Sequence, residues 1–345
     1  MFSVSMYHQQ NSKKQFTFAQ NVRCFSEMKN RIIKLGLLFF LTITFTNSVA
    51  QKNNSSPDSS KYFITGKPLS NKDSLKFYER RLISLGESII TAREMAQRYT
   101  STYHFARTLI SALKIPNSFD YPFDSVKKYI SILTPPDKKF RIFTWSLKWG
   151  KDSLVTADSF EFYGAIQMNN KEKLELYGLY DNSTKVGKAE YSELSNRSWY
   201  GALYYQMAVV KYRRKKYYTL LGWDGHSMAS SRKVIDVLTF DEMGKPVFGA
   251  PIFDMSDKKP PKYRVVFEFR DDAVMTVRYI KKKKLIAFEN LIPPSPNAVG
   301  LYEQYLPDGS YDYFVFKKGK WIKKKLLFEN VKNIPMDAFS PSGLR

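Results

Sequence analysis

Residues 141–150, RIFTWSLKWG, mark the point where the hydrophobic pattern of the chain changes its period. Large apolar side chains alternate there with smaller or polar ones: Phe143, Trp145, Leu147 and Trp149. This alternation is typical of a half-buried strand, whereas apolar residues upstream recur every three or four positions, as in a helix. The stretch therefore predicts an antiparallel β domain over residues 137–333, preceded by a helical unit over residues 68–136.

Three helices are predicted in the helical unit. Ser70, with Asp73 three residues later, forms a capping box, and apolar residues recur on one stripe from Leu75 to Tyr99. A second helix is predicted from about Thr102 to Leu113. A third, from about Phe123 to Leu133, would stop before two prolines, because proline disfavours helix in the residue that precedes it.

The period of two returns repeatedly in the β domain, between turn signals at 169–170, 241–246, 281–284, 307–310 and 317–320. About ten to thirteen strands are expected, with no repeat of fixed length. The high aromatic content of 16% also favours strands. The predicted fold is mainly β with a small α-helical N-terminal unit, its antiparallel meander forming a barrel, a sandwich or an irregular propeller-like sheet array.

Successive turns of a meander alternate between the two ends of a sheet, which predicts which loops meet. If residues 211–216 form the first turn, residues 317–320 form the ninth, which lies at the same end of the sheet. Residues 281–284 form the sixth turn, which lies at the other end. Six residues would gather at the even-numbered end: Trp223, Asp224, His226, Asp254, Asp257 and Asp308. Carboxylates beside an aromatic ring suit a sugar or peptide, so we expect any ligand site there.

Residues 28–51, MKNRIIKLGLLFFLTITFTNSVAQ, have the layout of a secretory signal peptide. A basic segment precedes the apolar run 35–45, which is shorter than the roughly 20 residues that a membrane-spanning helix needs. We expect cleavage between Ala50 and Gln51, export to the periplasm or the extracellular space, and no transmembrane anchor in the mature form. Residues 1–27 would be a mis-assigned start or a disordered extension, 51–67 a disordered leader, and 334–345 a C-terminal tail.

Cleavage would change the chemistry available to the protein. Residues 1–50 hold six of the 55 Lys and Arg residues and one of the 32 acids, so the net charge would fall from +23 to +18. Cys24 would be lost as well, leaving no cysteine and two histidines, His104 and His226. No cofactor and no metal site is predicted. The positive charge favours polyanions such as envelope polysaccharide.

Several segments of the β domain together resemble a group of uncharacterised exported bacterial proteins. They include PFDSVKKYIS (122–131), RIFTWSLKWG (141–150), YYTLLGWDG (217–225), KVIDVLTFDEMGKPVFGAPIF (233–253) and FKKGKW (316–321). The resemblance spans about residues 120–321. It implies export and brings no activity, cofactor or catalytic residue.

Three motifs could carry chemistry. Residues 225–229, GHSMA, nearly match the nucleophile elbow of α/β-hydrolases, but no histidine follows His226 to act as the base. Asp308, Ser310 and Asp312 have the alternate spacing of calcium ligands without the closing bidentate acid, which favours a plain turn. Acids interrupt apolar strands at Glu161, Asp236, Glu268 and Glu289, and two of them on neighbouring strands could hydrolyse a glycan. Glu161 and Glu268 lie opposite the aromatic face of their strands, so the simpler interpretation is an outward carboxylate paired with a neighbouring Lys or Arg such as Arg264.

Three turns are rich in lysine or arginine and could bind a polyanion: 211–216, 281–284 and 317–320. Because successive turns alternate between the two ends of the sheet, the 281–284 turn would lie at the opposite end from the other two. Solvated hairpin tips are therefore favoured over a nucleic-acid groove, and no specific nucleic acid is predicted. We expect a non-enzymatic binding or structural module of the cell envelope, with a possible polysaccharide, peptide or other polyanion as partner. The alternative is an envelope glycan hydrolase that uses strand-borne carboxylates.

Overall fold

A computed structural model of the chain describes residues 69–149 and 159–325. These residues all belong to the second of two compact units, Leu69–Arg345. The mis-assigned start, the signal peptide with its cleavage at Ala50 and Gln51, the leader and the C-terminal tail are predictions that lie outside the described residues. Within them the predicted class is confirmed: the fold is mainly β, with two helices at its N-terminal side and antiparallel sheets.

The first helix, α2 (Asn71–Thr91), begins as its capping box predicts. Ser70 Oγ accepts a hydrogen bond from Asp73 N at 3.1 Å and donates one to the Asp73 carboxylate at 2.6 Å. The prediction that this helix continues to Tyr99 was wrong, because the backbone becomes extended at Ala92 and a second helix starts at Met95. The two helices, α2 and α3 (Met95–Leu113), bury apolar residues in the same cluster, so their apolar spacing reads as one stripe.

The predicted third helix does not form. Its segment contains a single 3₁₀ turn, Val126–Lys128, followed by strand β1 (Ser131–Leu133). Phe123, Val126 and Ile130 are buried at spacings of three and four, which imitates a helix. Phe123, however, has a φ of 51°, outside the helical region, and β1 pairs with the next strand. The unit predicted over 68–136 is therefore two helices and the first strand of the β region.

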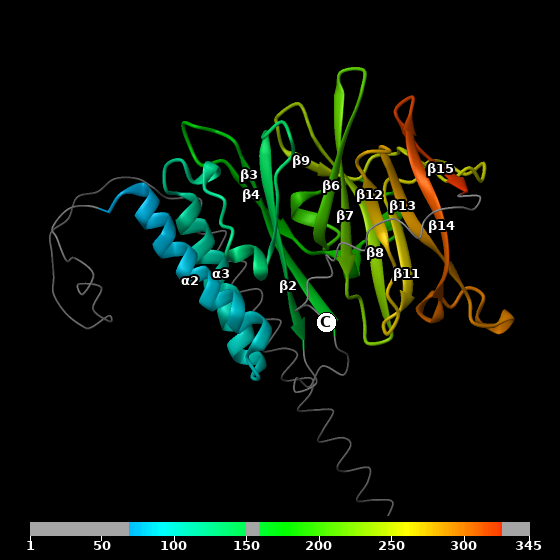
Figure 1. Ribbon diagram of the computed structural model, residues 1–345, viewed down its shortest axis with the longest axis horizontal. Helices are drawn as coiled ribbons and strands as arrows, with labels where there is room; N and C mark the ends of the chain where they lie inside the picture. Colours follow the sequence, from blue (N-terminus) through cyan, green and yellow to red (C-terminus); the bar gives the residue numbers. More distant parts are fainter. Residues whose placement is uncertain (1–68, 150–158, 326–345) are drawn as a thin grey trace, which may run out of the picture. The chain divides into compact units, whose positions relative to one another are not determined.

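The first sheet has the order β1-β2-β3-β4. Its longer strands are β2 (Phe140–Trp149), β3 (Ser159–Met168) and β4 (Leu176–Tyr180). Phe143, Trp145 and Leu147 pack against the helices, which lie on that face in Figure 1. The other face meets the second sheet, where Tyr204 N donates to Thr144 Oγ1 at 3.1 Å. Strand β2 is thus covered on both faces, and the prediction of a half-buried strand was wrong because its polar side packs against a second layer.

The second sheet has the order β5-β9-β8-β7-β6, with β11 also paired to β8. Its strands are β5 (Leu194–Ser195), β6 (Leu203–Tyr212), β7 (Lys215–Asp224), β8 (Ser230–Phe240), β9 (Pro246–Phe248) and β11 (Val265–Arg270). Two strands share one edge of β8: β9 pairs with its C-terminal residues and β11 with its N-terminal ones. This arrangement leaves β11 beside the end of the sheet where β7 finishes and β8 begins.

The third sheet has the order β10-β15-β14-β13-β12. Its strands are β10 (Phe253–Asp254), β12 (Val277–Ile280), β13 (Leu285–Ile292), β14 (Leu306–Lys317) and β15 (Lys320–Lys325). β10 lies parallel to β15, whereas every other pairing between the named strands is antiparallel. None of the sheets closes into a barrel. The described part is a stack of helices and three sheets, which corresponds to the sandwich or irregular sheet array among the predicted alternatives.

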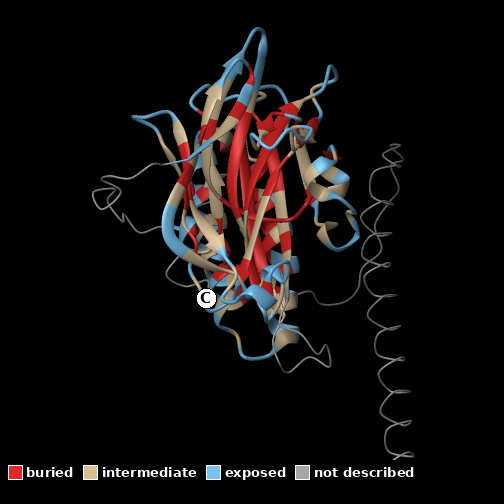
Figure 2. Cartoon of the chain, turned by 90° about the vertical axis from the view of Figure 1, so that its right-hand side faces the viewer, coloured by how far each residue is buried: buried red, intermediate tan, exposed pale blue. Residues whose placement is uncertain are grey.

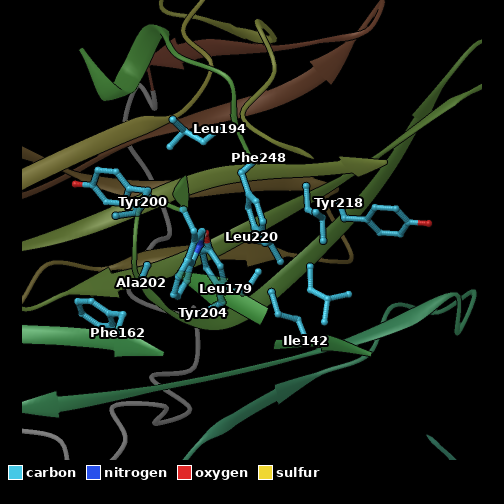
Figure 3. Packing of buried hydrophobic residues seen from close by; sticks show 14 of the residues in the cluster. Ile142, Phe162, Leu179, Leu194, Tyr200, Ala202, Tyr204, Tyr218, Leu220 and Phe248 are labelled. Carbon is cyan, nitrogen blue, oxygen red and sulfur yellow. The ribbon is translucent and has the colours of Figure 1, made fainter. Parts of the chain in front are cut away.

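Two apolar layers hold the three sheets together. Phe140, Phe162 and Ile166 of the first sheet pack with Tyr204 and Leu220 of the second, as Figure 3 shows for part of this cluster. On its other face the second sheet packs against the third, with Ile235 and Val237 beside Phe288, Phe314 and Trp321. Burial accordingly runs along the middles of the strands and gives way to exposure at the turns (Figure 2). Neither helix in the described part is long and apolar enough to cross a membrane.

Strand register corrects the predicted distribution of turns between the two ends. Leu285 pairs with Val315, so the 281–284 turn extends from the same end of the third sheet as the turn that joins β14 to β15. A Cβ on Gly319 in that turn would lie 2.6 Å from the Tyr212 ring, which places the β6–β7 turn beside it. The alternation fails because β9 and β10 are too short to cross a sheet, while the chain passes between the second and third sheets. All three lysine-rich turns lie at one end, in the upper part of Figure 1.

Candidate functional site

The charged residues at the opposite end of the second sheet form a continuous group that we call the Arg232 cluster: Asp224, His226, Ser230, Arg232 and Glu268. Arg232 on β8 has Asp224 of β7 and Glu268 of β11 as its cross-strand neighbours. Its guanidinium donates to Glu268 Oε2 from Nε at 2.9 Å and from the terminal nitrogen at 2.7 Å. The other terminal nitrogen lies 4.0 Å from Asp224 Oδ2. One cation is therefore held between two carboxylates on three adjacent strands.

The loop between β7 and β8 adds the histidine to the cluster. His226 N donates to Asp224 Oδ1 at 2.9 Å, which fixes the start of the loop. His226 Nε2 then lies 3.9 Å from Glu268 Oε1, and the same oxygen accepts a hydrogen bond from Ser230 Oγ at 2.7 Å. The exposed fraction of the side chain is 37% for His226 and 21% for Glu268, against 6% for Asp224. A ligand would reach His226 and Glu268 first.

Burial and neighbouring charges separate the pKa values of the two acids. Burial raises the pKa of Asp224 to about 6, although the His226 amide and Arg232 oppose the shift. Burial also acts to raise the pKa of Glu268, but hydrogen bonds from Ser230 and Arg232 outweigh it, so the pKa lies below its ordinary value. The pKa of His226 is lowered by burial and by Arg232, despite the opposing effect of Glu268. At neutral pH the cluster therefore carries a neutral imidazole and a net negative charge.

A second charged pair lies further inside the second sheet than the Arg232 cluster and is fully buried. Four residues along β8 from Arg232, Asp236 accepts a hydrogen bond from Arg264 Nε at 3.2 Å, and both side chains are completely buried. Asp236 also accepts from Tyr204 Oη at 3.2 Å, and Tyr204 Oη in turn accepts from Trp199 Nε1 at 2.9 Å. The prediction that Glu268 pairs with a neighbouring base is confirmed, but the base is Arg232 and not Arg264, the example given, because Arg264 pairs with Asp236 inside the core.

Tyr200 lies between the Arg232 cluster and the buried pair of Asp236 and Arg264, and contacts both. Its hydroxyl lies 3.5 Å from Asp224 Oδ2, and the Arg264 guanidinium carbon lies 5.9 Å from the centre of its ring. The pKa of Tyr200 is raised by burial and by the charge of Asp224, so the hydroxyl remains protonated at neutral pH and can donate to that carboxylate. Asp224 is thus positioned from the core side as well as from the loop.

The structure places the six predicted site residues in different surroundings. Asp224 and His226 belong to the Arg232 cluster. Trp223 is partly buried and packs its ring against Phe160, with centroids 4.8 Å apart, as part of the apolar layer below the first sheet. The other three accept hydrogen bonds from residues two positions further along the chain: Asp254, the last residue of β10, from Ser256 N, Asp257 from Lys259 N, and Asp308, within β14, from Ser310 N and Oγ.

The candidate motifs take ordinary structural roles. Ser227 Oγ accepts from the amides of Ala229 and Ser230, which closes a tight turn rather than presenting a nucleophile beside a base. Glu289 accepts from Thr276 N at 2.5 Å. Among the described residues, no group of three or more His, Cys, Asp or Glu side chains could hold a metal ion. Of the strand-borne acids, Glu268 is the one that takes part in the Arg232 cluster.

Sequence reasoning missed Arg232 and Ser230, which complete the cluster. Their signal was available in part, because Ser230 and Arg232 alternate at the start of an apolar strand directly after the Asp224 loop. Their partner on β11, Glu268, lies more than thirty residues away in the chain, and only the pairing of β8 with β11 brings it close. No protein-family model matches the chain, and no significant match is found among curated proteins or solved structures.

Proposed function

We propose that the chain is an exported module of the cell envelope that binds a polar ligand at the Arg232 cluster. The observation that carries this proposal is the partly exposed pair of His226 and Glu268, whose side chains lie 3.9 Å apart. Ser230 and Arg232 hold the Glu268 carboxylate through hydrogen bonds. A site whose polar groups are already oriented loses little conformational entropy when a ligand binds.

The chemistry of the cluster favours a ligand rich in hydrogen-bond donors. Glu268 is ionised and accepts hydrogen bonds, while the neutral imidazole of His226 offers one donor and one acceptor. The negative balance of the cluster disfavours a carboxylate or phosphate at this position. Sugar hydroxyls, or the amide and amino groups of a peptide, satisfy these groups best. Export and envelope location rest on residues 28–51, which supply the signal-peptide pattern.

Calorimetric titration of the protein with soluble peptidoglycan fragments, sugar and peptide portions separately, tests this function. Glu268→Gln should weaken binding by about tenfold or more, since hydrogen bonds to charged groups are worth about 1.5–3 kcal/mol. His226→Ala should weaken it by about two- to tenfold, since a hydrogen bond between neutral groups is worth about 0.5–1.5 kcal/mol. Asp257→Asn and Asp308→Asn are matched controls, because each of these acids accepts its hydrogen bond from a residue two positions further along the chain. Equal losses in the control variants, or unchanged binding in the cluster variants, would contradict the proposed site.

One observation favours the hydrolase as a second candidate. The pKa values of Asp224 and Glu268 are displaced in opposite directions, as those of a catalytic acid and its partner carboxylate are. Against it, the Asp224 side chain is 6% exposed and Arg232 lies between the two acids. Incubation with envelope glycans, followed by an assay for new reducing ends, decides between the two. Hydrolysis that Glu268→Gln abolishes would establish the enzyme; an inactive wild-type protein that binds the fragments supports the module.

A further inference from the structure

We propose that the end of the molecule opposite the Arg232 cluster is a docking surface for an anionic lipid bilayer. This end is formed by the three lysine-rich turns, which we call the basic end: residues 211–216, 281–284 and 317–320. The proposal goes beyond the ligand site and does not depend on it, because it rests on different residues at the other end of the strands.

The basic end concentrates positive charge without compensation. The twelve basic residues of the three turns are all exposed: Lys211, Arg213, Arg214, Lys215, Lys216, Lys281, Lys282, Lys283, Lys284, Lys317, Lys318 and Lys320. None of the three turn sequences contains an acid. Of the twelve, Lys216 alone forms an ion pair with a described residue, 2.7 Å from Asp137. So much like charge in one place is repulsive unless an anionic partner meets it.

The three turns are held together as one surface. The β14–β15 turn contacts Tyr212 at the tip of β6, as the close approach of Gly319 shows. The 281–284 turn extends beside it, because Leu285 pairs with Val315 near the end of β14. Tyr279 N donates to Gln206 Oε1 at 2.8 Å, which ties β12 to β6 below the turns. The charges are therefore presented by rigid strands from two packed sheets.

Each turn of the basic end places a lysine or arginine at a backbone position whose conformation favours glycine or asparagine. Each turn holds one basic residue in the left-handed region, with φ of 52° at Arg213, 52° at Lys284 and 50° at Lys318. Glycine or asparagine adopts this conformation with less strain than a lysine or arginine does. The turns thus carry positive charge at a small cost in conformational energy.

The composition of the basic end favours a bilayer over a nucleic acid or a polysaccharide chain. Single-stranded nucleic acids stack on a series of exposed aromatic rings, whereas the basic end has a single aromatic residue, Tyr212. Its ring is 36% exposed, with Gly319 against it and the Arg213 guanidinium carbon 5.4 Å from its centre, and Trp321, which follows the third turn, is completely buried. Ten of the twelve basic residues are lysines, which act as hydrated point charges, whereas arginine supplies the two-pronged recognition of a single phosphate. Point charges on projecting turn tips suit a flat surface of anionic headgroups, which attracts each basic residue without a fitted groove.

Flotation with vesicles of phosphatidylcholine, with and without phosphatidylglycerol, tests the proposal on the full chain. The wild-type protein should bind the anionic vesicles and lose binding as salt is raised, because screening weakens exposed charges. Changing Lys281, Lys282, Lys283 and Lys284 to Gln should weaken binding by about fivefold for each lysine that reaches the surface. Changing the same four residues to Arg should leave binding intact, which shows that the variant turn still folds.

A control with equal net charge separates a surface from simple attraction. Four exposed lysines on the helical side serve this purpose: Lys72, Lys76, Lys114 and Lys128. Their change to Gln should leave vesicle binding within about twofold of wild type. Equal losses in both Gln variants would overturn the proposal, since net charge alone would then explain the binding. It would also fall if single-stranded DNA or an anionic polysaccharide bound through the 281–284 turn while anionic vesicles did not.

Discussion

Removal of the Asp236 carboxylate should destabilise the fold by about 3–5 kcal/mol, the usual cost of breaking a buried ion pair. Asp236 and Arg264 are both completely buried, and Asp236 accepts hydrogen bonds from Arg264 Nε at 3.2 Å, Tyr204 Oη at 3.2 Å and Val237 N at 2.8 Å. In the Asp236→Leu variant the guanidinium keeps its bond to the Ser192 carbonyl at 2.9 Å but loses its counter-charge. A buried, uncompensated cation results.

Urea unfolding followed by circular dichroism measures this cost, and a double-mutant cycle identifies its origin. Arg264→Met should destabilise the fold by a similar amount, since it leaves the Asp236 carboxylate buried without its counter-charge. The double variant, Asp236→Leu with Arg264→Met, should lose about 2–3 kcal/mol less than the sum of the single losses, because neither charge is then left alone. Asp236→Leu losing less than about 1 kcal/mol, or single losses that simply add, would refute the argument that the pair is energetically coupled.

Two further predictions concern the pKa of Asp224 and the packing of helix α2. The pKa of Asp224 is raised to about 6, so at pH values between about 4 and 6 the folded state binds more protons than the unfolded chain does. Stability should therefore fall as pH rises, by about 2 kcal/mol from pH 4 to pH 6 and by about 3 kcal/mol over the whole titration. The unfolding free energy of wild type minus that of Asp224→Asn should increase by about 2 kcal/mol from pH 6 to pH 4, and a constant difference would contradict the assigned burial. Gly86→Ala should destabilise by about 1–2 kcal/mol, although alanine is the better helix former, because the new Cβ would lie 2.8 Å from Tyr129 Cβ. Gly187→Ala, with no atom within 4 Å of the new Cβ, is the matched control and should be neutral or slightly stabilising in the same unfolding assay.

Local patterns predicted the elements that depend on local interactions. The Ser70 capping box set the start of α2 correctly, and the alternation from residue 141 onward announced strands that the structure contains. The same patterns failed where the burial of a side chain comes from a distant partner. Phe123, Val126 and Ile130 are buried by the helices and the first sheet, so their spacing resembles a helix that the backbone does not form.

The candidate site was predicted only as far as one loop. The sequence singled out Asp224 and His226, because a charged loop follows an apolar strand, and it singled out Glu268 as an acid within a strand. The sequence could not show that Glu268 lies beside Asp224 and His226. The strand assignment left open which neighbour β11 would choose, and β11 lies beside β8, so Arg232 and not Arg264 became the partner of Glu268.

By itself the sequence determined the composition of the molecule and its class: a basic, aromatic-rich chain whose hydrophobic period indicates a helical segment followed by strands. The tertiary structure decided which ends of those strands meet. Counting successive turns as alternating between the two ends of a sheet placed the 281–284 turn opposite the other basic turns. That assignment was wrong, because β9 and β10 are too short to cross a sheet and the chain passes from the second sheet to the third. Hydrophobic period records whether a residue faces a core, whereas the grouping of charges at each end depends on strand order and register, which arise from contacts between segments distant in the chain.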